Sequence, residues 1–225
     1  MWIDPRLYQF TKSVEFLIPQ LPSADNATVH LLTADTPPIT RTRTARLIVI
    51  PGDESRFIAL LPPASLITIQ DGSQAKATVA DTPFLLFRSI TAEPAVGLAG
   101  RVACFGSNLE LFQPQLSLTA EQVTVNLLWR LPAGTLPAYT VFVHLYQDGL
   151  VVGQGDSYPA NGLFPFAWLR PGDMIRDPHS ISLDPGVFST STGKIGVGVY
   201  DAGSGHRQPA TDCAGQALGD EVFIR

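Results

Sequence analysis

The segment Val123–Trp129 has the sequence VTVNLLW and alternates apolar with polar side chains over most of its length. Its odd-numbered positions are three aliphatic residues and Trp129, whereas Thr124 and Asn126 occupy the opposite face. Successive side chains of a β-strand point to opposite faces of a sheet, so a period of two residues is typical of a strand with one buried side. The segment therefore predicts a strand whose Trp129 side lies in a core.

The segment Tyr139–Tyr146, with the sequence YTVFVHLY, repeats this alternation. Asp148-Gly149 separates it from the apolar run Leu150–Val152. Asp-Gly between two apolar runs favours a tight hairpin, because both residues tolerate positive φ. A β-hairpin is therefore expected over these two runs.

The rest of the chain contains short apolar runs bounded by turn-forming residues. Its 19 glycines and 19 prolines, with 16% charged residues, favour short strands joined by turns over long helices. The fold class is thus predicted to be all-β. Further strands are expected at Val14–Ile18, Thr28–Thr33, Ala45–Ile50, Arg56–Leu61, Ser65–Gln70, Pro83–Ile90, Lys194–Tyr200 and Glu221–Ile224.

Two glycines stand out within the expected strand Lys194–Tyr200. Gly196 and Gly198 leave one of its faces nearly bare. Glycine weakens a strand, so its recurrence predicts that a bulky ring or another backbone packs there. A ligand groove is the alternative.

The chain of 225 residues has room for two modest domains. The strand pattern lapses into small residues and a proline over Thr91–Gly97. We therefore expect two β-sandwich-like modules, an N-terminal β-rich module at 1–97 and a C-terminal sandwich at 98–225. The second module is expected to be jelly-roll or immunoglobulin-like, with about eight strands.

The charge and hydropathy of the sequence argue against a nucleic acid partner and against a membrane-spanning helix within this chain. The net charge is −5, and no basic run is present that could follow a phosphate backbone, so no nucleic acid partner is expected. No apolar run approaches the ~20 residues of a membrane helix, and the start of the chain lacks the order of a signal peptide. We expect a soluble region, cut from a larger protein or complete in itself.

The sequence shows no motif of known catalytic chemistry. It has no Gly-x-Ser-x-Gly elbow, His-Glu-x-x-His helix, phosphate-binding loop or dinucleotide fingerprint. Glycoside hydrolysis requires two carboxyl groups that face each other across a cleft, which sequence spacing does not show. The 20 acidic residues lie mostly in turn contexts, so chance pairs among them are expected. We expect no catalytic residues, no enzymatic activity and no cofactor.

Cys104 and Cys213 are the two cysteines. Cys104 is expected before the first strand of the second module and Cys213 before its last strand. The first and last strands of a sandwich are often neighbours, so a disulfide fits these positions. Two free thiols are the alternative.

A polar cluster is expected from His144, Asp156, Asp177 and His179. Carboxylates and imidazoles can converge on a metal ion, and calcium is the candidate ion. His144, however, lies within an expected strand, and the other three flank expected turns, where such side chains commonly bond the backbone. A hydrogen-bonded structural cluster without metal is therefore preferred.

An aromatic segment at 158–170 offers a candidate ligand site. Sugar rings present apolar C–H faces that stack on exposed aromatic rings, while polar neighbours orient the hydroxyls. The alternative is that the segment folds over a sheet edge and its rings fill the core. The candidate ligand-binding residues are Tyr158, Asn161, Phe164, Phe166, Trp168 and Arg170.

From about Phe105 onward the order of motifs resembles the C-terminal β-sandwich domain of polytopic bacterial membrane glycosyltransferases, the dolichyl-phosphate-mannose mannosyltransferase-like (glycosyltransferase family 39-type) proteins. The resemblance covers roughly the last half of the chain, and its motifs specify a family rather than a chemistry. The matching segments are FGSNLEL at 105–111, VNLLWR at 125–130, YTVFVHL at 139–145, DG at 148–149, GDSYP at 155–159, WLRPGD at 168–173, IRD at 175–177 and GVYD at 198–201.

This resemblance implies a non-catalytic accessory region on the outer side of a membrane, at the cell surface or in the periplasm, tethered through membrane segments of the same polypeptide. Glycan is the expected ligand. The alternatives are a stand-alone carbohydrate-binding module and a structural or protein-interaction spacer. The transferase chemistry would belong to membrane-embedded segments outside this chain.

Overall fold

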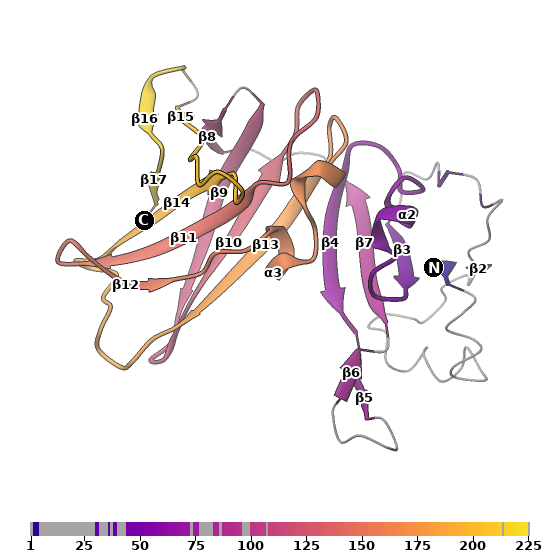
Figure 1. Cartoon of the computed structure of the whole chain (residues 1–225), viewed down its shortest axis with the longest axis horizontal. Helices are drawn as coiled ribbons and strands as arrows, with labels where there is room; N and C mark the ends of the chain where they lie inside the picture. The colour runs from indigo at the N-terminus through magenta and orange to yellow at the C-terminus, as the bar shows by residue number, and fades with distance from the viewer. Residues whose placement is uncertain are drawn as a thin grey trace. The chain divides into compact units, whose positions relative to one another are not determined.

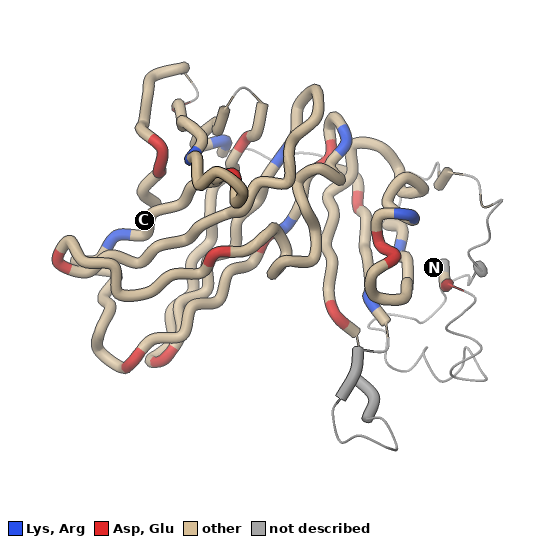
Figure 2. The backbone as a smooth tube through the Cα atoms, viewed as in Figure 1, with Lys and Arg blue, Asp and Glu red and all other residues tan. Residues whose placement is uncertain are grey.

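The computed structural model describes residues 2–4, 30–31, 36, 38–39, 44–72, 74–76, 83–85, 87–95, 100–106, 108–212 and 214–224. It is 50% strand and 7% helix, which confirms the all-β, sandwich-like prediction. The chain divides into two compact units, Met1–Pro94 and Ala95–Arg225 (Figure 1). The division falls slightly before the expected cut at residue 97. Acidic and basic residues are interspersed along the described chain (Figure 2).

The described residues of the first unit form a sheet of strand order β4-β7-β3-β1-β2 and a separate hairpin, β5-β6. Aliphatic residues such as Leu47, Ile67 and Ile90 are buried on these strands and supply the core. The bounds are β1 Trp2–Ile3, β2 His30–Leu31, β3 Ala45–Val49, β4 Ser65–Asp71, β5 Gln74–Lys76, β6 Pro83–Leu85 and β7 Arg88–Pro94.

The expected strands at Ala45–Ile50 and Ser65–Gln70 are confirmed as β3 and β4. Pro83–Ile90 is divided between β6 and β7 rather than forming one strand. Within Thr28–Thr33 the structure describes the pair His30–Leu31, as β2, and Val14–Ile18 lies outside the described residues.

The expected strand Arg56–Leu61 is wrong, because the chain there forms helix α2, Glu54–Ile58. Its buried residues are Glu54, Phe57 and Ile58. Spacings of three and four residues place side chains on one face of a helix, not of a strand. The apolar run in this segment is too short to show a helical period clearly in the sequence.

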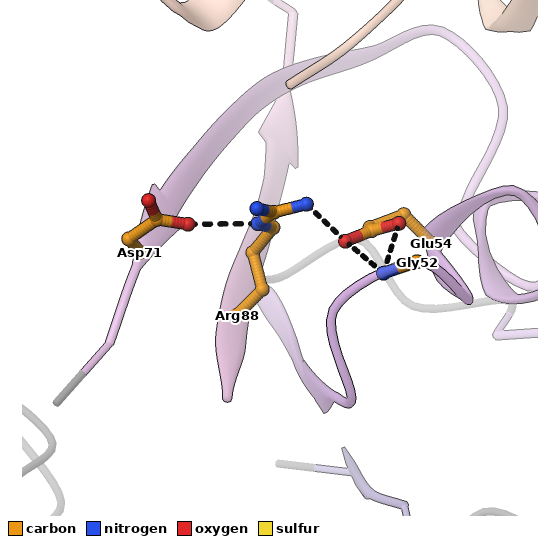
Figure 3. A network of polar contacts seen from close by, with 4 residues as sticks. All are labelled: Gly52, Glu54, Asp71 and Arg88. Carbon is orange, nitrogen blue, oxygen red and sulfur yellow. Dashed lines mark hydrogen bonds and ion pairs between the residues drawn. The ribbon is translucent and has the colours of Figure 1, made fainter. Parts of the chain in front are cut away.

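Arg88 of β7 ties helix α2 to the sheet (Figure 3). Its Nε donates to Asp71 Oδ1 of β4 at 2.8 Å, and its Nη1 pairs with Glu54. Both oxygens of Glu54 also accept from the Gly52 amide at 3.0 Å. A buried carboxylate is tolerated when its charge is paired and its oxygens are hydrogen-bonded. Arg88 and Gly52 therefore allow the helix to begin with a buried acid.

The second unit packs two sheets, of strand order β16-β15-β8-β9-β10-β13 and β12-β11-β14-β17. Along the chain, successive strands cross from one sheet to the other several times. The first sheet contains β8 Arg101–Phe105, β9 Leu109–Leu118, β10 Gln122–Arg130, β13 Met174–Ser182, β15 Ala210–Thr211 and β16 Ala217–Gly219. The second contains β11 Thr140–Gln147, β12 Leu150–Gln154, β14 Lys194–Tyr200 and β17 Val222–Ile224, and the short helices α3 Pro159–Gly162 and η3 Phe166–Trp168 follow β12.

The predicted strand around Trp129 is confirmed as β10, with its odd-numbered residues buried. Trp129 is fully buried and meets Phe105 and Phe166 edge to face, with ring centroids 5.6 Å apart in both pairs. The predicted hairpin is confirmed as β11–β12, with Asp148 and Gly149 at φ of 52° and 81°. Edge-to-face aromatic contacts stabilise a core beyond the effect of the apolar area that they bury. Trp129 is thus a centre of this core.

Cys104 does not precede the first strand of the second unit but lies within it, in β8. Its register partner is Thr211 of β15, while the last strand, β17, belongs to the other sheet. The premise that the first and last strands are neighbours is therefore wrong. Cys213 lies outside the described residues, so the disulfide stays a prediction.

Candidate functional site

The predicted polar cluster divides into two pairs, one inside the sandwich and one on its surface. Asp177 and His179 lie in the middle of β13 and are buried, so the prediction that they flank turns is wrong. They face Leu127 and Val125 in the β10–β13 register, on the inward side of the sheet. His144 and Asp156 form the second pair, with Nε2 and Oδ1 3.6 Å apart, and the Asp156 charge also acts on His179.

Asp177 joins separate parts of the second unit. Its Oδ2 accepts from Trp129 Nε1 at 2.8 Å and contacts His179 Nε2 at 2.9 Å. Its Oδ1 accepts from the Ala160 amide in α3 at 2.9 Å. A buried carboxylate with three partners holds β10, β13 and α3 together. It leaves no oxygen facing open space and therefore acts structurally.

His179 is held between two acceptors. Its Nε2 faces the Asp177 carboxylate, and its Nδ1 faces the Gly155 carbonyl at 3.0 Å. Burial lowers the pKa of His179, but the Asp177 charge, its hydrogen bond and the Gly155 carbonyl outweigh burial and raise it above 6.5. In the imidazolium form both ring nitrogens carry the N–H groups that these two acceptors require, and the raised pKa favours that form. Among the described residues, no group of three or more His, Cys, Asp or Glu side chains is placed to hold a metal ion.

The aromatic segment at 158–170 packs mainly inward. Phe164 and Phe166 are fully buried, so their rings offer a ligand no exposed surface in this structure. Trp168 is partly buried and meets Phe164 edge to face at 5.6 Å. The turn α3 places Ala160 and Asn161 at φ of 57°, which brings the Ala160 amide to Asp177. The arrangement matches the alternative in which the segment fills the core.

The remaining polar members of that segment are Tyr158, Asn161 and Arg170. Asn161 is exposed, and Tyr158 is partly buried. Arg170 pairs with the buried Asp173 through Nε at 2.7 Å, and a second guanidinium nitrogen lies 3.3 Å from the other oxygen. A two-point arginine–carboxylate pair fixes the guanidinium geometrically. Arg170 thus stabilises its own turn.

The outer face of the β12-β11-β14-β17 sheet carries a second group of aromatic and polar side chains. Phe142, His144 and Tyr146 alternate along β11 and lie opposite Gly198, Gly196 and Lys194 of β14. Phe223 of β17 lies opposite Gly196 on the other side of β14. The alternation of strand side chains places these rings together on one surface.

The two β14 glycines make room for neighbouring side chains on this face. A Cβ at Gly198 would collide with the ring of Phe142, and one at Gly196 would collide with the carboxylate of Glu221. The expectation that a bulky ring packs against these glycines is confirmed for Gly198. The Arg207 guanidinium lies 4.3 Å above the Phe142 ring and covers this end of the face.

Beside the glycines, Tyr146 and Glu221 form a hydrogen-bonded pair. The Tyr146 hydroxyl donates to the two Glu221 oxygens, at 3.0 and 3.2 Å. His144 Nδ1 lies 3.4 Å from the same hydroxyl. Burial and the Glu221 hydrogen bond raise the pKa of Tyr146 above 10.0, so the phenol keeps its proton. The Glu221 carboxylate is thereby engaged within the protein.

The other end of the outer face is open. Phe223 is 55% exposed, its ring meets Tyr146 edge to face at 5.8 Å, and Lys194 Nζ lies 5.7 Å from its centroid. A hollow of about 360 Å³ adjoins it. We name this hollow the Phe223 site; it is lined by Tyr146, Asp148, Gly149, Thr192, Lys194 and Phe223.

Sequence reasoning did not select the Phe223 site. It assigned Asp148-Gly149 to a turn and Glu221–Ile224 to a strand, and both elements are where it placed them. Phe223 stands between the buried Val222 and Ile224, so the period of two puts its ring on the solvent side. An outward aromatic residue in a strand was the available signal.

Comparisons of the chain with protein-family models, curated proteins and solved structures found no match. Within the described residues, no helix has the length and apolar character needed to cross a membrane.

Proposed function

We propose that the chain is a non-catalytic, glycan-binding accessory region, and that glycan binds at the Phe223 site. The observation that carries the proposal is the half-exposed ring of Phe223 on a sheet face, bordered by Tyr146 and a hollow with hydroxyl and charged groups. A sugar ring stacks its C–H face on such an aromatic surface, and burying that surface favours binding.

The polar lining suits sugar hydroxyls. A hydroxyl both donates and accepts hydrogen bonds. Lys194 supplies a donor, Asp148 supplies an acceptor, and the Thr192 hydroxyl supplies both. These groups surround an aromatic platform, as in small-molecule sites where a few polar groups fix the orientation of an apolar contact.

The same lining supports binding over hydrolysis. Glycoside hydrolysis in most families takes a pair of carboxyl groups that flank the bond to be cleaved. Asp148 is the one carboxylate among the six lining residues, and the nearby Glu221 is engaged by the Tyr146 hydroxyl. We therefore assign the hollow a binding role.

The proposed setting is extracytoplasmic, within a membrane glycosyltransferase-like protein. The order of motifs from Phe105 onward, which resembles the C-terminal domain of such proteins, supports it. The reading frame that encodes this chain should then also encode several apolar spans of about 20 residues. A frame without such spans would favour the stand-alone carbohydrate-binding module.

Binding is tested on a glycan array with the full chain and two variants. Phe223→Ala removes the platform and should lower the affinity for the bound glycans at least ten-fold. Leu118→Ala is the matched control, because Leu118 is 46% exposed on β9 of the other sheet. Equal binding by Phe223→Ala and the unchanged chain would exclude this site, and silence of the whole array would favour a spacer.

A further inference from the structure

A second hollow, of about 520 Å³, adjoins the Phe223 site. The two hollows share Thr192, Lys194 and Phe223 in their linings. A residue that lines both hollows stands at their boundary, and Phe223 is such a residue. The volumes of both hollows lie within the usual range for small-molecule sites, about 300–1,000 Å³.

The second hollow has an apolar floor and a hydroxyl rim. Phe188, Ile195 and Ile224 are nearly buried and provide the floor. Thr190 and Ser191 are exposed and provide the rim. Apolar surface below and hydroxyls at the edge repeat the chemistry of the Phe223 site, so a second sugar ring would meet similar contacts.

The rim belongs to a loop, 188–193, that is ordered by hydrogen bonds before any ligand arrives. Gln147 of β11 donates from Nε2 to Thr192 Oγ1 at 2.8 Å, and its Oε1 accepts from the Ser189 amide at 3.2 Å. The Ser189 and Ser191 hydroxyls are 2.8 Å apart, and the Gly193 amide donates to the Ser189 carbonyl at 2.7 Å. A loop held in this way loses little conformational entropy when a ligand binds.

The charges of the two linings cancel. Asp148 and Lys194 are their acidic and basic members, and Tyr146 keeps its proton. A site with one carboxylate and one ammonium group carries no net charge, so a charged ligand is attracted by one group and repelled by the other. The hydroxyls of a neutral sugar ring accept hydrogen bonds from the ammonium group and donate hydrogen bonds to the carboxylate.

We propose that the two hollows are adjoining subsites for one neutral oligosaccharide whose chain crosses Phe223. This inference rests on the proposed function and specifies its ligand. A monosaccharide occupies one subsite, whereas two or more linked rings occupy both and pass Phe223 at the boundary between them. Affinity therefore rises with chain length, and charged sugars of equal length gain less.

The experiment titrates the full chain with defined sugars followed by NMR. The neutral probes are glucose, cellobiose and cellotetraose, with galactose and β-1,4-galactotetraose as a second series. The charged probes are tetragalacturonate and the chitosan tetramer. In at least one neutral series, affinity should rise ten-fold or more from monosaccharide to tetrasaccharide, and the charged tetramers should bind at least ten-fold more weakly than the neutral one.

A double variant tests the second subsite. Thr190→Val with Ser191→Ala removes the rim hydroxyls and should reduce the gain from monosaccharide to tetrasaccharide at least five-fold. Thr135→Val, an exposed threonine outside both linings, should keep that gain. A gain that survives the double variant would overturn the second subsite.

The outcomes separate the two proposals. Equal affinity for monosaccharide and tetrasaccharide, or tighter binding of a charged tetramer, overturns the neutral two-subsite inference and leaves glycan binding in place. No binding of any probe, together with a silent glycan array, overturns the proposed function and the inference with it.

Discussion

Asp177 is the residue on which the polar interior of the second unit depends. Its carboxylate accepts from the Trp129 indole and the Ala160 amide and pairs with His179. All three partners are donors, so a neutral amide at this position would turn its own N–H₂ group toward another donor. The carboxylate is therefore required by its partners rather than by a ligand.

The variant Asp177→Asn should lower the free energy of unfolding by about 3 kcal/mol, as for other buried ion pairs that lose one partner. Urea unfolding followed by tryptophan fluorescence measures it. Asp184→Asn is the control, since Asp184 is exposed in the turn after β13, and surface changes usually stay within about 0.5 kcal/mol. A wild-type midpoint for Asp177→Asn would refute the structural role.

His179 gives stability a dependence on pH. Its pKa is raised in the folded protein above 6.5, so folding favours the protonated form. The stabilisation is fully present below pH 6.5 and is lost as the pH rises through the folded pKa. Urea midpoints measured between pH 5.5 and 9 should therefore fall with rising pH.

The variant His179→Gln should show a flatter profile over this range, because no imidazolium remains to be deprotonated. His206→Gln, which changes an exposed histidine after β14, should follow the unchanged chain. Identical slopes for the unchanged chain and His179→Gln would assign the dependence to other groups. The pKa values of Tyr146 and Tyr200 are raised above 10.0, so neither tyrosine titrates within the pH range of the measurement.

At the scale of elements, β14 shows why a strand with two glycines is stable here. Gly198 lies opposite Phe142, whose ring occupies the space of the missing side chain, and the Asp220 carbonyl lies 2.7 Å from where a Cβ would stand. The ring is in turn covered by Arg207. The weakness of glycine in a strand is offset by aromatic packing across it.

Gly198→Ala should therefore destabilise the second unit by about 1–3 kcal/mol, the usual cost of overpacking. The methyl group meets both a ring and a backbone carbonyl, and the carbonyl cannot move without disturbing the segment before β17. Gly203→Ala is the matched control, because the nearest atom to its Cβ is a side-chain oxygen 3.4 Å away. Thermal unfolding of the two variants compares them directly, and equal melting temperatures would contradict the overpacking.

Elements with a local signal were predictable from the sequence. The period of two located β10 and β11, and Asp148-Gly149 located their hairpin partner β12. β13 was missed because its inward positions carry Asp177 and His179 and it contains Pro178. The hydrogen-bond partners that allow those polar residues to be buried come from distant segments of the chain, and no local sequence pattern indicates them.

The candidate site was missed for the same reason. Its lining comes from the β11–β12 turn, the loop before β14 and the last strand, which are far apart in sequence and meet only in the folded sheet. The aromatic segment at 158–170 was a more visible signal, because several rings are close in sequence. Clustering along the chain does not reveal exposure, and here the rings of Phe164 and Phe166 turn inward.

At the scale of the molecule, each unit has its own strands and its own core. The rings that surround Trp129, those of Phe105 and Phe166, belong to the second unit, as do both hollows at Phe223. Compact units with separate cores commonly fold alone. Glycan binding should therefore be a property of the second unit.

A fragment of residues 95–225 should unfold cooperatively, give a β-type circular dichroism spectrum and bind the same glycans as the full chain within about two-fold. The reason is that Trp129, Asp177 and the loop held by Gln147 find their partners within this range. Titration of fragment and full chain with one glycan from the array provides the measurement, and the Phe223→Ala fragment is the control for site-specific binding. A folded fragment that no longer binds would mean that residues 1–94 contribute to the site, and a fragment without a cooperative transition would show that the core depends on them.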